Sequence, residues 1–152
     1  MKNLLQQLRI LHLALTTMVV IIGGVFHFVL LPFVQNKPTE NNIIFQITTV
    51  VIVVGSQVFI KSVLPKFLTN AQNQPNLETK LQTYKIPFMM KLAILEGACL
   101  MALVFYLFTA KFFYVGMATA VLILLILQYP TPQNLAYDLK LSQEEQQELQ
   151  TN

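Results

Sequence analysis

The sequence predicts an all-α protein built as a four-helix transmembrane bundle, and three observations lead to that fold class. The chain of 152 residues is 55% hydrophobic but only 11% charged, whereas a soluble domain carries roughly 25% charged residues. Its apolar residues gather into four runs of about 20 residues, the length that crosses a bilayer as a helix. Its charges lie in short blocks between those runs, as expected where lipid replaces water around the helices.

The four spans are expected at about residues 10–31, 43–64, 88–109 and 112–129. The first run is longer than the ~7–15-residue apolar region of a cleaved signal peptide, so we expect a retained helix. Pro32, Pro65 and Pro130 follow three of the runs and are expected to end those helices. Spans one–two and three–four then form two antiparallel hairpins in a membrane domain over residues 1–130.

A polar connection precedes the third run. It carries apolar side chains at helical spacing, with Asn76 in the N-cap position: Leu77, Leu81, Tyr84 and Phe88. This pattern predicts a cytoplasmic interfacial helix that lies against the headgroups and leads into the third span.

The tail, residues 131–152, is polar and is expected to be cytoplasmic. Thr131 followed by Pro132 has the N-cap and first-turn pattern of a helix start. Ser142 with Glu145 three residues later matches a capping box. Two short helices are therefore expected in the tail, either packed against the bundle or mobile.

The basic residues predict the orientation. Eight of the ten fall near the N-terminus, in the region from Lys61 to Lys91 or in the tail, namely Lys2, Arg9, Lys61, Lys66, Lys80, Lys85, Lys91 and Lys140. Only Lys37 and Lys111 fall on the other side. Because cytoplasmic loops are enriched in Lys and Arg, both termini are expected in the cytoplasm, with the protein in the cell membrane.

Glu96 is the only carboxylate inside an apolar run. Burying a carboxylate in a membrane helix costs roughly 2.5–3.5 kcal/mol on insertion scales, so a partner is expected. Lys61 and Gln57 of the antiparallel second span should reach a similar depth. Two interpretations follow: a structural polar cluster that fixes how the hairpins dock, or a proton- or ion-binding carboxylate.

His27 and Gln46 lie in the outer parts of the first and second spans, and we expect a hydrogen bond between them. Haem ligation by His27 is the alternative, and it requires a second axial ligand on a facing helix. His12 lies on the same helix, more than about 20 Å away along the axis. One chain therefore cannot supply both histidines, and no cofactor is expected unless an oligomer or a partner completes the site.

Small residues recur four positions apart in Ala93 with Gly97, Ala98 with Ala102, and Gly116 with Ala120. Such spacing is typical of helix-packing faces, within one chain or between chains. Cys99 and the six methionines are interpreted as packing residues. No nucleophile with a base, phosphate-binding loop or metal-ligand cluster is apparent in the sequence, so no catalytic or metal site is predicted.

Two segments of the second half of the chain stand out: LAILEGACLMALVFYLFT, with its "LEG-A" opening of the third helix, and the tail YPTPQNLAYDLKLSQEE. Over about residues 88–148 the chain thereby resembles a group of uncharacterised small bacterial integral membrane proteins with four predicted helices. The resemblance implies a four-helix membrane protein and adds no mechanism.

The expected function is therefore that of a multi-pass integral membrane protein, not an enzyme, that acts as an accessory or scaffold protein through helix–helix contacts. Its expected partners are the lipid bilayer and a second copy or a larger membrane complex, with no nucleic acid. The alternative is a small transporter or channel subunit that uses Glu96 after oligomerisation.

Overall fold

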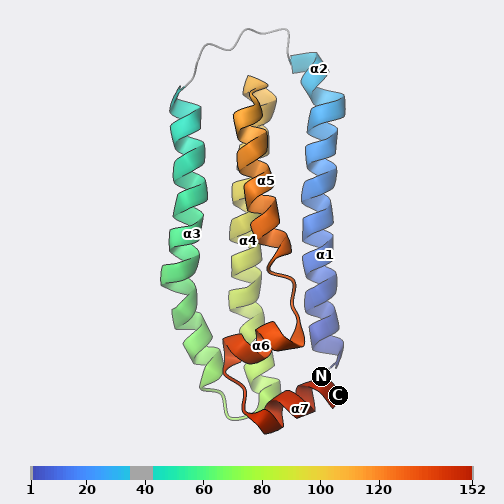
Figure 1. The fold of residues 1–152 in the computed structure, drawn as a ribbon, viewed down its shortest axis with the longest axis vertical. Helices are drawn as coiled ribbons and strands as arrows, with labels where there is room; N and C mark the ends of the chain where they lie inside the picture. Colours follow the sequence, from blue (N-terminus) through green and yellow to red (C-terminus); the bar gives the residue numbers. More distant parts are fainter. Residues whose placement is uncertain (1, 35–42, 152) are drawn as a thin grey trace.

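The computed structural model describes residues 2–34 and 43–151, and this part of the chain is all-α (Figure 1). The elements are α1 (Lys2–Val25), a π-helical turn η1 (Phe26–Leu30), α2 (Leu31–Val34), α3 (Ile43–Gln72), α4 (Leu77–Thr109), α5 (Phe112–Ile126), α6 (Pro132–Leu139) and α7 (Gln143–Thr151). The polar loop expected between the first two spans lies largely outside the described residues.

Helix α4 is the centre of the bundle. It packs against α3, α5 and α1. Helices α3 and α5 run antiparallel to α4, and α1 runs parallel to it (Figure 1). In its most apolar stretch 44% of the residues are buried, against 6% for the helix of residues 4–33 and 11% for α3. The apolar side chains of α1 and α3 therefore face mainly outward, where a bilayer rather than protein would cover them.

Three described helices are long and apolar enough to cross a membrane, which supports a membrane location. They cover residues 4–33, 43–72 and 77–109. The fourth apolar helix, α5, has 15 residues and is about 22 Å long, less than the ~30 Å hydrocarbon core. Hydrogen-bonded turns continue it, because Gln128 and Tyr129 donate backbone N–H groups to Leu125 and Ile126.

Two prolines do not end their helices, contrary to the prediction. The first helical rod continues past Pro32 to Val34, and α3 continues seven residues past Pro65 to Gln72. Proline removes one backbone donor and crowds the carbonyl four residues earlier, but a helix held by its neighbours tolerates this in a membrane setting. Beyond Pro65, the Thr69 hydroxyl donates to the Pro65 carbonyl at 2.9 Å.

The prediction of a separate interfacial helix before the third span is also wrong, because α4 is one helix of 33 residues that contains Pro87. The apolar residues predicted at helical spacing are all buried and join the same core as Leu92 and Leu95: Leu77, Leu81, Tyr84 and Phe88. This continuous apolar face crosses the proline without a break. Asn76 begins the helix as expected, and its N–H donates to the Thr79 hydroxyl at 3.3 Å.

The tail helices α6 and α7 pack across the end of the bundle where α1 begins (Figure 1). Their caps are confirmed: the Thr131 hydroxyl accepts from the Asn134 N–H at 3.1 Å, and Ser142 and Glu145 cap each other reciprocally. Four leucines of the tail enter the main core, namely Leu135, Leu139, Leu141 and Leu149. Of the two states expected for the tail, the structure therefore has the packed one.

Candidate functional site

Glu96 lies on the side of α4 that faces away from α3. Phe105 follows it by nine residues, which at about 100° per residue places the two side chains on opposite faces of the helix. The Phe105 ring stacks on Phe45 of α3, with ring centroids 5.1 Å apart. Leu103, only about 20° from Glu96 around α4, instead lies against Gly23 of α1. Glu96 therefore sits at the seam between α4 and α1.

The structure does not bring Glu96 together with Lys61 or Gln57. Lys61 is exposed on α3, and Gln57 has only a long contact of 3.5 Å to the Ser56 hydroxyl. Within residues 2–34 and 43–151, the one ion pair joins Lys80 to Glu145. The cluster expected from depth alone is absent because the rotation of α4 turns Glu96 toward the opposite neighbour.

His27 contacts Tyr106 of α4 and not Gln46. Its Nδ1 lies 2.6 Å from the Tyr106 hydroxyl, and the two rings are nearly parallel with centroids 6.0 Å apart. In the described part of the chain, Gln46 has no hydrogen-bond partner. The sequence did not predict Tyr106 as the partner of His27, because Tyr106 lies in an aromatic cluster typical of a membrane interface. Its position on the buried face of α4 was the signal that could have indicated this contact.

The second histidine, His12, is occupied elsewhere. It is 2% exposed and its Nε2 lies 2.8 Å from the Leu125 carbonyl oxygen. A carbonyl only accepts, so Nε2 carries the proton and Nδ1 is left as an acceptor, for which the described residues supply no donor. His12 therefore ties α1 to the end of α5, and it lies on the same helical rod as His27, as expected.

The π-helical turn that holds His27 has a local cause. The Leu31 N–H donates to the Phe26 carbonyl, five residues back instead of four. Pro32 follows directly, and in a regular α-helix its ring would crowd the carbonyl of Phe28. One wide turn before the proline changes the hydrogen-bond register and relieves that conflict. Such turns are frequent at functional sites, which directs attention to His27.

A cavity of about 210 Å³ lies between α1, α4 and α5 beside this turn. Its walls are mainly apolar and include Val19, Gly23, Leu103 and Leu122. The polar lining comes from the His27–Tyr106 pair together with Thr119 and the thiol of Cys99. The Cys99 thiol donates to the Ala118 carbonyl at 3.3 Å. An apolar enclosure with few polar groups is the usual form of a small-molecule site.

The small-residue faces divide into internal and outward ones. Ala98 and Ala102 are 3% and 0% exposed and serve contacts within the chain. Ala93 is exposed, and a Cβ added at Gly97 would meet nothing within 4 Å. The same holds for Gly116, whose neighbour four residues on, Ala120, is exposed. The backbone at these outward positions is open to another helix.

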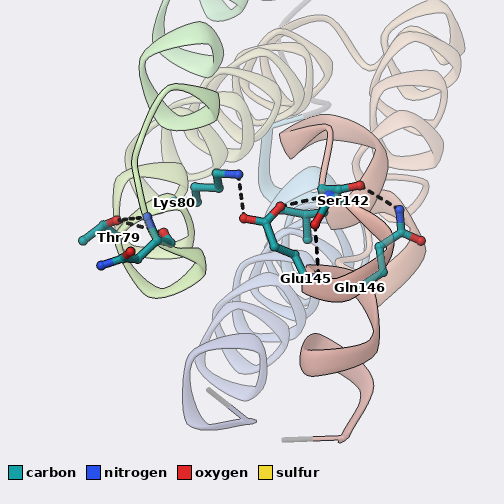
Figure 2. A network of polar contacts seen from close by, with 7 residues as sticks. Thr79, Lys80, Ser142, Glu145 and Gln146 are labelled. Atoms are coloured by element: carbon teal, nitrogen blue, oxygen red, sulfur yellow. Dashed lines mark hydrogen bonds and ion pairs between the residues drawn. The ribbon is translucent and has the colours of Figure 1, made fainter.

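Hydrogen bonds and an ion pair join the tail to the end of the bundle where α1 begins. The Tyr84 hydroxyl donates to the Asp138 carboxylate at 2.7 Å, and the Gln72 amide donates to the Asp138 carbonyl at 2.6 Å. Figure 2 shows the Lys80 ammonium directed at the Glu145 carboxylate, 2.6 Å away. Hydrogen bonding from Lys80 is the largest cause that lowers the pKa of Glu145.

The first helix is held at the same end. The Arg9 guanidinium donates to the Pro130 carbonyl at 3.2 Å and lies over the Tyr129 ring, 5.8 Å from its centroid. The start of α1 and the start of the tail therefore lie at one end of the bundle.

No protein family, curated protein or solved structure matches this chain.

Proposed function

We propose that this protein crosses the cell membrane four times, with both termini in the cytoplasm, and acts as a non-enzymatic accessory protein through helix–helix contacts. The contact Arg9–Pro130 supports an even number of crossings, because it holds the two ends of the membrane domain together. The turns that extend α5 to Tyr129 support the fourth crossing. The excess of Lys and Arg at that same end supports the cytoplasmic assignment.

The observation that carries the proposal is an unsatisfied carboxylate beside an open helix face. Glu96 lies within a helix apolar enough to cross a membrane, and no described residue donates to it or pairs with it. Ala93 and Gly97 flank it on the outward surface of α4. Small residues let a foreign helix approach the backbone closely, and a donor on that helix would satisfy the carboxylate. The binding face proposed here is therefore the surface around Ala93, Glu96 and Gly97.

Cysteine crosslinking in native membranes tests this face. In a Cys99→Ala background, Ala93→Cys should give an adduct, either of twice the chain mass for self-association or with a different membrane protein. Ile47→Cys is the matched control, because Ile47 is 57% exposed on α3, away from the Glu96 seam. Adducts no more frequent from Ala93→Cys than from Ile47→Cys would refute the proposal.

A transporter or channel subunit is the second candidate, favoured by the same unpaired Glu96. A polar pathway would then form only where copies of the chain meet, since α4 presents this carboxylate at the surface of a single copy. Proton or ion flux in liposomes should depend on Glu96 and fall in Glu96→Gln. Unchanged flux in that variant would remove this alternative and leave the accessory role untouched.

A further inference from the structure

The size of the cavity between α1, α4 and α5 restricts what it can hold. Its volume is about 210 Å³. A dry apolar cavity of about 150 Å³ accommodates benzene. The space therefore matches one substituted six-membered ring, and it is too small to enclose the whole of a membrane lipid.

The His27–Tyr106 pair at the polar end of the cavity has one hydrogen-bond donor to spare, whichever tautomer His27 adopts. If the Tyr106 hydroxyl donates to Nδ1, the imidazole proton is on Nε2, which has no partner among the described residues. If Nδ1 carries the proton and donates to Tyr106, the phenol proton is the unused donor. Each arrangement leaves one N–H or O–H free, since the pair shares two protons and one hydrogen bond.

An unused donor close to the boundary of the hydrocarbon core costs free energy until an acceptor reaches it. The cavity opens toward the outside of the bundle, where His27, Thr119 and Val20 are exposed at its edge. In a membrane this opening faces lipid. A guest would reach it by diffusing within the bilayer, and an acceptor oxygen on that guest would satisfy the donor.

We propose that this cavity binds a lipid-soluble single-ring carbonyl compound, the chemical class of a quinone ring. The ring fills the apolar part between Gly23, Leu103 and Leu122, and one carbonyl oxygen accepts from the His27–Tyr106 pair. Binding alone is assigned, with no chemistry on the ring. This proposal rests on other side chains than the partner-binding face around Glu96, because the His27–Tyr106 pair and the cavity walls do not include Ala93, Glu96 or Gly97.

Two probes of similar shape, one with carbonyl groups and one without, measure what the carbonyl contributes to binding. Duroquinone is a tetramethylated ring with two carbonyl groups, and durene is the tetramethylated ring without them. The full chain in lipid nanodiscs is titrated with each probe, with concentrations expressed as mole fraction in the bilayer. Binding is followed by the rise in unfolding temperature, since a ligand of the folded state stabilises it by mass action.

The variants test the two parts of the site separately. His27→Phe/Tyr106→Phe removes both donors while retaining rings, and it should weaken duroquinone about 3- to 10-fold, the value of one hydrogen bond, with durene unchanged. Thr119→Trp should obstruct the opening and weaken both probes. Ile123→Trp is the control, because Ile123 is 53% exposed on α5 and does not line the cavity.

The outcomes separate the possible occupants. Selective loss of duroquinone in the double variant, with loss of both probes in Thr119→Trp only, supports the site. Equal responses of duroquinone and durene to the double variant would show an apolar space filled by lipid chains and overturn the carbonyl assignment. Absence of saturable binding, or equal effects of Thr119→Trp and Ile123→Trp, would overturn the site itself.

Discussion

Replacing Glu96 by leucine is expected to stabilise the isolated protein. Glu96 lies 13 residues before Thr109, the last residue of α4, or about 20 Å below the end of the helix. With Thr109 near one boundary of a hydrocarbon core about 30 Å thick, the carboxylate lies about 10 Å from the other boundary. No described residue compensates its burial, so Glu96→Leu should raise the free energy of unfolding by about 1–3 kcal/mol.

The sign of this prediction follows from the tertiary structure. A pair with Lys61, expected from the sequence, would make Glu96→Leu destabilising, because a lysine would remain buried without its partner. Lys61 is instead exposed on α3. Lys61→Met should therefore leave the unfolding of both the wild type and Glu96→Leu unchanged.

Thermal unfolding of the detergent-solubilised monomer measures the effect. Cys99 is 1% exposed, so its reaction with a maleimide dye reports unfolding without an added label. Met101→Leu is the control, because Met101 is 41% exposed on the same helix and its replacement changes little apolar area. A loss of stability in Glu96→Leu, restored by adding Lys61→Met, would refute the reasoning and establish the pair.

Three further predictions concern the docking of the tail on the bundle and the packing of the core. Tyr84→Phe removes the hydrogen bond to Asp138 and should cost about 1.5–3 kcal/mol of α6 docking, measured as faster amide exchange in α6. Lys80 lowers the folded-state pKa of Glu145. The stabilisation from Glu145 is therefore present above its unfolded pKa and is lost as the pH falls through the folded pKa. Docking of the wild-type tail should weaken in acid, measured as faster amide exchange in α7, and Glu145→Gln should reduce this pH dependence. Leu125→Ala, at a side chain with 0% exposure, should cost about 2–5 kcal/mol in thermal unfolding.

Each of these has a matched control. Tyr137 is 85% exposed, so Tyr137→Phe should leave α6 exchange unchanged. Glu144→Gln should retain the weaker docking of the tail in acid, since Glu144 is exposed next to Glu145. Leu127→Ala should be nearly neutral, with Leu127 66% exposed. Equal effects at a buried position and its control would contradict the packing described for that region.

The membrane-facing character and the helix starts could be predicted from the sequence because both depend on local information. The length and hydropathy of a run determine whether it can lie in hydrocarbon. The caps at Thr131 and Ser142 depend on side chains within three residues of the backbone they satisfy. The buried stripe of α4 also followed from its spacing, since Leu81, Tyr84 and Phe88 recur on one helical face.

What the tertiary structure alone decided is which neighbour each face meets. Depth and periodicity placed Glu96 level with Lys61, but the rotation of α4 directs it to the α1 seam. His27 meets Tyr106 from within a π-helical turn that precedes Pro32. Proline ends a helix only where packing does not hold the chain. That α4 continues across Pro87 therefore depends on the core packed around it, which the sequence alone did not show. The physical reason is common to all three: a sequence pattern defines a face, while the docking of whole helices selects its partner.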